Sequence, residues 1–229
     1  ELFSKGEINQ ALDAVQDLLK DYPNEPVLFN IKGACYADLG QLDVAVTNYK
    51  EAITIKPDYA KAHFNLAGSL HDLGQLETAV QSYQKAIEID ASYAEAYNNL
   101  GNVYQELKQV DSAVQSYQKA LEIKPDYVAA QYSLGNTFME LGQLEEAVKS
   151  YKAALKLKPD FAGAYNKLGS SLLELDQLDE SVRSYEAALK HKPDYVEAIN
   201  NLGIAFYKLQ QMDDAIRSYE RAITLDPDF

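Results

Sequence analysis

The 229-residue sequence has little positive charge for its size. It carries 35 acidic against 21 basic residues, which gives a formal net charge of −14. Nucleic-acid backbones and anionic membranes are bound through clusters of Lys and Arg. We therefore expect neither nucleic acid nor a membrane as a partner.

Long apolar runs and cysteines are also scarce. No uninterrupted apolar stretch approaches the ~18 residues of a membrane-spanning helix. The single cysteine, Cys35, excludes a disulfide within the chain, and no secretory signal pattern opens the printed sequence. These features favour a reducing compartment, and we expect a cytoplasmic location.

The residue patterns of catalysis and metal binding are missing as well. His63 and His71 are eight residues apart, about 12 Å along a helix, which is too far to share a metal ion. The sequence contains neither HExxH nor CxxC, and no nucleophile elbow or phosphate-binding glycine loop. We expect no active site, no metal and no cofactor in this segment, and we interpret Cys35, His63 and His191 as packing residues.

What the sequence does contain is a repeat of 34 residues. The stretch "ASYAEAYNNLGNVYQELKQVDSAVQSYQKALEIK" at 91–124 is one copy. Residues 1–22 are the second half of an earlier copy, and 227–229 open another. We therefore expect a single array over 1–229 that was cut from a longer chain. The full copies are 23–56, 57–90, 91–124, 125–158, 159–192 and 193–226.

Each copy predicts two amphipathic helices, A and B, because its apolar residues recur with a period near 3.6. Helix A is expected near 26–39 and at each 34-residue step to 196–209. Helix B is expected near 8–21 and at each step to 212–225. Gly40, Gly74 and Gly142 suit left-handed turns between the two helices. The aspartates that follow proline suit N-caps of helix A, namely Asp58, Asp126, Asp160 and Asp194.

This pattern resembles the tetratricopeptide repeat (TPR) family. The family signature is present at Tyr97, Leu100, Gly101, Tyr104, Ala113, Tyr117, Ala120 and Pro125. The resemblance implies an all-α, right-handed superhelical solenoid in which the A helices line a concave groove. It also implies a protein–protein interaction module, which binds an extended peptide or partner segment in that groove and is not an enzyme.

The positions that the resemblance places in the groove hold many asparagines. Asparagine is a poor residue inside a helix, and Asn98, Asn99 and Asn102 lie off the apolar stripe of their helix, so packing does not explain them. An amide both donates and accepts hydrogen bonds and so suits a peptide backbone. Asn65, Asn99 and Asn201 resemble the asparagine-lined groove in the repeat domain of O-GlcNAc transferases. The alternative is that asparagine is merely tolerated in helix A. The expected groove residues are Asn30, Phe64, Asn65, His71, Asn98, Asn99, Asn102, Tyr132, Asn136, Asn166, Lys167, Asn200, Asn201 and Tyr207.

Charge and chain ends suggest further properties. An acidic row near the ends of the A helices favours a neutral or basic ligand over an acidic one, although a solvated face explains the row equally well. The apolar face of helix 212–225 is expected to be uncapped and to allow self-association. Two alternative functions remain open: a substrate-recruiting arm of a larger transferase, and a self-assembling structural scaffold. The acidic row is Asp38, Asp72, Glu106, Glu140 and Glu174.

Overall fold

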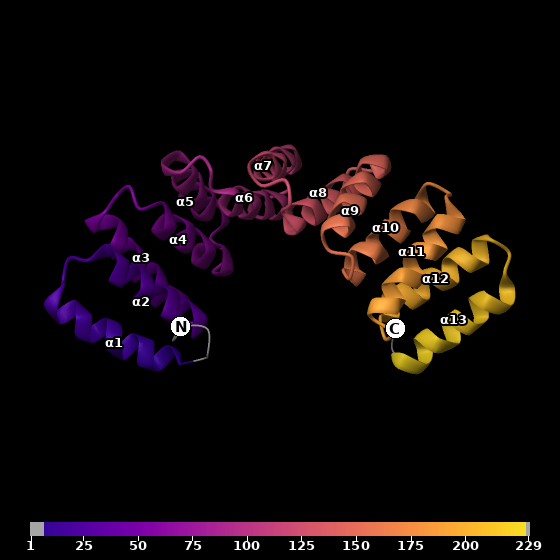
Figure 1. Ribbon diagram of the computed structural model, residues 1–229, viewed down its shortest axis with the longest axis horizontal. Coiled ribbons are helices and arrows are strands. Elements are labelled where there is room, and N and C mark those ends of the chain that lie inside the picture. Colours follow the sequence, from indigo (N-terminus) through magenta and orange to yellow (C-terminus); the bar gives the residue numbers. More distant parts are fainter. Residues whose placement is uncertain (1–6, 228–229) are drawn as a thin grey trace. The chain divides into compact units, whose positions relative to one another are not determined.

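The computed structural model describes residues 7–227, and these fold into thirteen α-helices with no strand (Figure 1). The B helices are α1 (Ile8–Asp21), α3 (Leu42–Ile55), α5 (Leu76–Ile89), α7 (Val110–Ile123), α9 (Leu144–Leu157), α11 (Leu178–His191) and α13 (Met212–Leu225). The A helices are α2 (Pro26–Asp38), α4 (Ala60–Asp72), α6 (Ala94–Glu106), α8 (Val128–Glu140), α10 (Ala162–Glu174) and α12 (Val196–Lys208).

The all-α prediction and the helix pairs are confirmed. Each B helix has its expected bounds, and each A helix ends one residue before the expected position. Asp228 and Phe229, which were expected to open a further repeat, lie outside the described residues, as do residues 1–6 of the partial first copy. None of the described helices is both long and apolar enough to cross a membrane.

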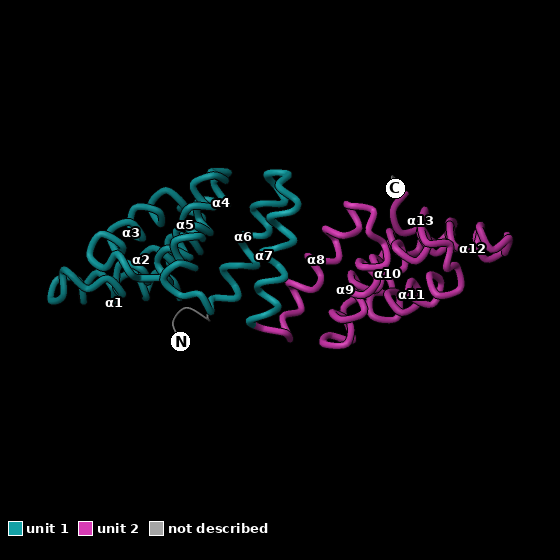
Figure 2. The backbone as a smooth tube through the Cα atoms, turned by 90° about the horizontal axis from the view of Figure 1, so that it is seen from above, with its two compact units in different colours: residues 1–123 teal, residues 124–229 magenta. Residues whose placement is uncertain are grey.

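The chain divides into two compact units, residues 1–123 and 124–229 (Figure 2). The division falls within one residue of the boundary between the repeats 91–124 and 125–158, so it separates no A helix from the B helix of its own repeat. We describe each unit by itself. The expectation of one continuous array stays a prediction.

In five of the six full repeats, helices A and B approach closely because a glycine of helix A faces a tyrosine ring of helix B; Ala67 takes this position in the other. A Cβ atom added to Gly101 would lie 2.6 Å from Cε1 of Tyr117, which is fully buried. Alanines on helix B, such as Ala113 and Ala120, complete the contact and are also fully buried. The small residues of the signature are therefore needed for helix contact. The same glycine–tyrosine contact occurs at Gly33, Gly135, Gly169 and Gly203.

The turns between helices A and B use the left-handed region of the backbone. Gly40, Gly74 and Gly142 have φ of 72°, 74° and 69°, as predicted. Lys108, Asp176 and Gln210 take the corresponding positions in the other repeats with φ of 61°, 58° and 62°. The left-handed conformation costs a residue with a side chain about 1 kcal/mol, so the repeat geometry imposes this turn even where the residue opposes it.

The predicted N-caps of helix A are wrong. The residue that caps the A helices from α4 to α12 is the aromatic residue after each predicted position, for example Tyr59 and Tyr195, and it makes no side-chain cap hydrogen bond. Lys56 and Lys192 lie over the rings of these two tyrosines, at 5.7 and 4.8 Å from the ring centroids. The aromatic residue therefore stands at the cap, and the aspartate precedes it by one position.

Candidate functional site

The A helices form the inner row of each unit. Successive A helices contact each other directly, α2 with α4 and α4 with α6 in one unit, and α8 with α10 and α10 with α12 in the other. Among the described residues no pair of B helices makes a comparable contact. Each unit therefore has a side lined by A helices, and every sequence-predicted groove residue lies on one of them.

Three of the predicted asparagines are buried. Asn30, Asn98 and Asn166 are 7%, 4% and 0% exposed. They occupy the same position of helix A in three repeats, and aromatic residues occupy it in two others. Their burial corrects the interpretation that asparagines at this position have no packing role.

The two aromatic residues at this position already stack on their neighbours. The Phe64 ring stacks on Tyr93 with 4.8 Å between ring centroids. Tyr132 lies 4.8 Å from Phe161 and 5.9 Å from Tyr151 by the same measure. Both side chains are half-buried, so only part of each ring remains for a ligand.

The adjacent position of helix A holds asparagines that reach back to the previous repeat. Asn65 Nδ2 donates to Asn30 Oδ1 at 2.9 Å, and Asn201 Nδ2 donates to Asn166 Oδ1 at 3.2 Å. Asn65 and Asn201 are themselves only half-buried. The structure thus brings together predicted residues of successive repeats, and it leaves one side of each outer amide accessible.

Asn98 and Asn99 pair within one helix. Asn98 Nδ2 donates to Asn99 Oδ1 at 3.1 Å. Oδ1 of Asn98 is buried and has no hydrogen-bond partner among the described residues. An unsatisfied buried acceptor is unfavourable, so this amide lacks the pairing that Asn30 and Asn166 obtain.

The third predicted position has a structural partner that the sequence analysis missed. Asn102 Oδ1 accepts a hydrogen bond from the buried Tyr117 hydroxyl at 2.8 Å, and Asn136 Oδ1 accepts one from Tyr151 at 2.7 Å. In both repeats the tyrosine follows the asparagine by 15 residues. That recurring spacing was the available signal. These asparagines accept hydrogen bonds from the hydroxyl groups of buried tyrosines, and Gln105 Oε1 is a second acceptor, 3.2 Å from the Tyr117 hydroxyl.

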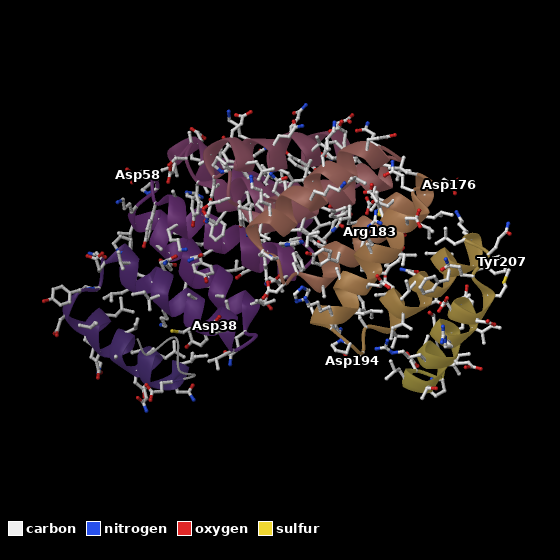
Figure 3. The ribbon with its side chains drawn as sticks, turned by 45° about the vertical axis from the view of Figure 1, so that its right-hand side comes forward. Asp38, Asp58, Asp176, Arg183, Asp194 and Tyr207 are labelled. Atoms are coloured by element: carbon white, nitrogen blue, oxygen red, sulfur yellow. The ribbon has the colours of Figure 1, made fainter. Side chains whose placement is uncertain are left out.

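The remaining predicted residues lie toward the ends of the A helices or next to charged groups. His71 Nε2 lies 2.7 Å from an oxygen of Glu106 on the next A helix, and Lys167 Nζ lies 3.4 Å from Glu197. Tyr207, labelled in Figure 3, is 58% exposed. Asp38, also labelled there, ends α2 and is exposed like the rest of the acidic row. The Lys167 ammonium group is therefore paired with a carboxylate.

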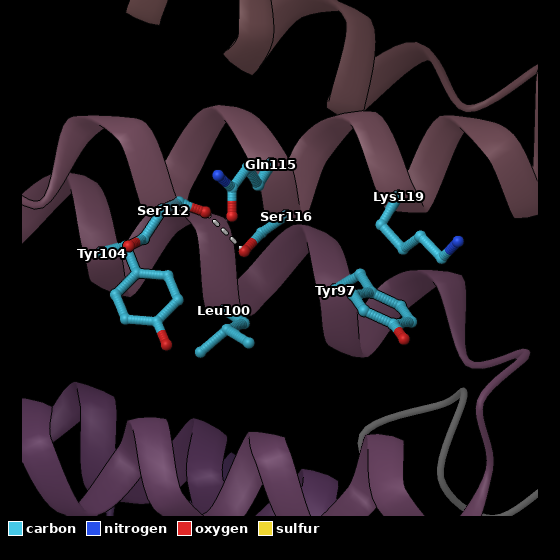
Figure 4. A pocket seen from close by; sticks show the side chains of 7 residues that line it. All are labelled: Tyr97, Leu100, Tyr104, Ser112, Gln115, Ser116 and Lys119. Carbon is cyan, nitrogen blue, oxygen red and sulfur yellow. Dashed lines mark hydrogen bonds between the residues drawn. The ribbon is translucent and has the colours of Figure 1, made fainter.

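Two cavities lie away from the predicted residues. One of about 400 Å³ lies beside α6 and α7 and is lined by Tyr97, Leu100, Tyr104, Ser112, Gln115, Ser116 and Lys119 (Figure 4). Its counterpart of about 430 Å³ is lined by the equivalent residues His63, Leu66, Ser82 and Lys85, and also by α3. None of the predicted groove residues lines either cavity.

The described residues contain no group of three or more His, Cys, Asp or Glu side chains arranged to hold a metal ion. Cys35 is fully buried, and its burial raises the pKa of the thiol, which keeps it in the unreactive form. His63 is buried with Nε2 2.9 Å from the Pro57 carbonyl oxygen. His191 is exposed and stacks on Tyr165 at 5.9 Å. The arrangement offers side-chain amides, hydroxyls and rings for binding.

Known proteins resemble this chain in sequence over short stretches. The peroxisomal targeting signal receptor of Candida glabrata is 32% identical over 67 residues, which are 29% of this chain and 11% of the receptor. The Hsp70-Hsp90 organizing protein 2 of Arabidopsis thaliana is 34% identical over 59 residues, 26% of this chain and 10% of that protein. The match thus spans about a tenth of the length of these curated relatives.

Solved structures match over most of the chain. YrrB, described as a TPR protein with an unusual peptide-binding site, has a TM-score of 0.70 and 28% identity, over 79% of this chain and 93% of YrrB. The C-terminal part of a TPR repeat-containing protein from Cytophaga hutchinsonii has a TM-score of 0.80 and 19% identity, over 100% of this chain and 94% of that chain. The second match shows the fold alone.

The family models agree with these structures. The TPR repeat model matches residues 33–71, 68–108, 101–142 and 135–176, and the Tetratricopeptide repeat model matches 166–228. The comparisons do not single out the O-GlcNAc transferase type of groove. The chain belongs to the tetratricopeptide repeat family.

Proposed function

We propose that the A-helix side of each unit binds an extended peptide segment of a partner protein, without catalysis. The observation that carries this proposal is the set of partly exposed amides on the A helices, Asn65 in the first unit and Asn200 and Asn201 in the second. Such amides hydrogen-bond a peptide backbone without reading its side chains. The peptide-binding site of YrrB, which is 28% identical, supports the same ligand class.

The ligand proposed here is neutral or basic. The row of exposed carboxylates at the ends of the A helices repels an acidic segment and speeds the encounter with a basic one. The thiol of Cys35 is buried and protonated, which is compatible with a cytoplasmic module that has no catalytic activity. The likeness of the asparagines to those of O-GlcNAc transferases extends the proposal to a substrate-recruiting arm, should the parent chain carry a transferase domain.

Peptide capture is expected to weaken when exposed groove residues are shortened. Asn200→Ala and Tyr207→Ala should each reduce affinity for a peptide selected from a display library by about 2- to 10-fold, the range for one lost hydrogen bond or its equivalent. Neither residue belongs to the asparagine pairs, so the melting temperature should not fall. Fluorescence anisotropy measures the affinity.

Gln118→Ala is the matched control, because Gln118 is an exposed amide on the B helix α7. It should leave affinity unchanged. Equal affinity of all three variants and the parent would show that the peptide binds elsewhere. Asn65, Asn99 and Asn201 are unsuitable for this test, because their removal also takes partners from buried groups.

A structural scaffold is a second candidate, and α13 is the reason. Met212, Ile216, Ile223 and Leu225 are between 45% and 59% exposed. The equivalents of Ile216 and Ile223 on α11 are Val182 and Leu189, which pack into the core formed with α12. The α13 face therefore has the chemistry of a helix-packing surface, and we propose that a second copy covers it in the 229-residue chain.

Sedimentation velocity tests this association. The parent should show a species heavier than the monomer whose fraction rises with concentration, and Ile216→Glu with Ile223→Glu should abolish it. Val44→Glu, at a similarly exposed position of α3, is the control and should still associate. A parent that stays monomeric at the highest attainable concentration would contradict the scaffold candidate.

A further inference from the structure

A chain of hydrogen bonds in the second unit links the outer asparagine of α12 to a carboxylate. Asn201 Nδ2 donates to Asn166 Oδ1 at 3.2 Å, and Asn166 Nδ2 donates to the Tyr195 hydroxyl at 3.3 Å. The Tyr195 hydroxyl donates to an oxygen of Glu197 at 3.4 Å, and Lys167 Nζ lies 3.4 Å from the other oxygen of this carboxylate. Asn166, in the middle, is fully buried.

The carboxylate sets the direction of every bond in this chain. An ionised carboxylate only accepts hydrogen bonds, whereas a tyrosine hydroxyl has one proton to give. Because Tyr195 gives that proton to Glu197, Asn166 has to donate to Tyr195 through its amide nitrogen. Oδ1 of Asn166 then faces α12 and has to accept from Nδ2 of Asn201. The oxygen of Asn201 is the end of the amide that is turned away from this chain.

The first unit contains the same asparagine pair but not its anchor. Asn65 Nδ2 donates to Asn30 Oδ1 at 2.9 Å. The residues equivalent to Tyr195 and Glu197 are Tyr59 and Lys61, and the Lys61 amine lies over the Phe64 ring at 5.2 Å. A lysine donates and cannot accept, so the position equivalent to Glu197 supplies no carboxylate to Tyr59.

We propose that Glu197 is a positioning residue for the groove: through Tyr195 and Asn166 it holds the Asn201 amide with its carbonyl oxygen available to accept an N–H of the bound peptide backbone. This inference rests on the proposed function. It assigns a specificity, because the bound segment has to present a backbone N–H at this point. A proline, or an ester in place of the peptide bond, is disfavoured there.

The orientation is tested by NMR on the full chain with ¹⁵N-labelled asparagine. The side-chain amide signals of Asn201 are assigned by their loss in Asn201→Ala. Tyr195→Phe removes the hydroxyl, and Glu197→Lys places a donor where the acceptor was. Both variants should move the Asn201 signals, although neither residue is hydrogen-bonded to Asn201. Glu186→Lys, an equal charge change on the exposed side of α11, should not move them. Unchanged Asn201 signals in both variants would overturn the positioning role.

The acceptor role is tested with a peptide selected against the parent chain by display and then resynthesised with one backbone ester at a time. One ester position should weaken binding to the parent by about 2- to 10-fold. The same ester should reduce the affinity of the Glu197→Lys variant by a smaller factor, because the Asn201 amide is no longer held with its oxygen outward. If the ester reduced the affinity of the parent and of Glu197→Lys by the same factor, the acceptor role would be overturned and the proposed function would remain. Failure to select any peptide, with the NMR response present, would overturn the proposed function and the acceptor role together, and the positioning of Asn201 would stand.

Discussion

Gly101→Ala is expected to lower the free energy of unfolding by about 1–3 kcal/mol, the usual cost of overpacking. The new methyl group would lie 2.6 Å from Cε1 of Tyr117. The ring has to shift to admit the methyl group, although it is fully buried and its hydroxyl is hydrogen-bonded to Asn102 at 2.8 Å. The gain in helix propensity, about 1 kcal/mol at most, offsets only part of this cost. Urea denaturation at neutral pH, followed by circular dichroism, measures the change.

Gly68→Ala is the matched control, since it makes the same chemical change in the A helix of the neighbouring repeat. The nearest atom to a Cβ at residue 68 is the Tyr83 hydroxyl oxygen, at 3.7 Å, which is ordinary contact. We expect this variant to be more stable than the parent by about 0.5–1 kcal/mol, because alanine is the better helix residue. If both variants changed the free energy of unfolding in the same direction, contact between the new methyl group and the tyrosine ring would not explain the effect of Gly101→Ala.

The protein is also expected to lose stability in alkaline solution between about pH 10 and pH 12. Burial raises the pKa of Tyr83 to about 12 and likewise that of Tyr93. Burial also raises the pKa values of Tyr49, Tyr151 and Tyr185 above the ordinary value. These hydroxyl groups therefore stay protonated in the folded chain at a pH where they ionise in the unfolded chain.

The sign follows from linkage between protonation and folding. A folded-state pKa above the unfolded value of about 10 stabilises the protein fully below pH 10. That contribution is lost as the pH rises through the folded-state pKa, and for Tyr83 alone it amounts to about 2–3 kcal/mol. The urea midpoint as a function of pH, together with tyrosinate absorbance, measures the loss. Tyr83→Phe should make the decline shallower.

Ionisation of all tyrosines near pH 10 without unfolding would contradict this expectation. So would a urea midpoint that stays constant up to pH 12. Either result would mean that the tyrosine rings between the repeats are accessible to solvent.

The asparagines show how far the sequence alone could define the candidate site. Their places on the A helices follow from the repeat, and all fourteen predicted residues lie there. Their partners do not follow from it, because the Asn201–Asn166 bond joins residues 35 positions apart. A side chain that looks free on a helical wheel can be buried by the next repeat, as Asn166 is.

The sequence by itself determined the helices, their bounds to within one residue and their pairing, because a 34-residue period repeated six times leaves one consistent pattern of apolar faces and small residues. Only the tertiary structure decided which polar side chains form hydrogen bonds within the protein and which remain available to a ligand. Asn102 and Asn136 satisfy tyrosine hydroxyls, Asn166 is enclosed in a chain that ends at Glu197, and Tyr207 is left exposed. The physical reason is that apolar periodicity is a local property of one helix, whereas a hydrogen bond depends on where the neighbouring repeat places its donor or acceptor.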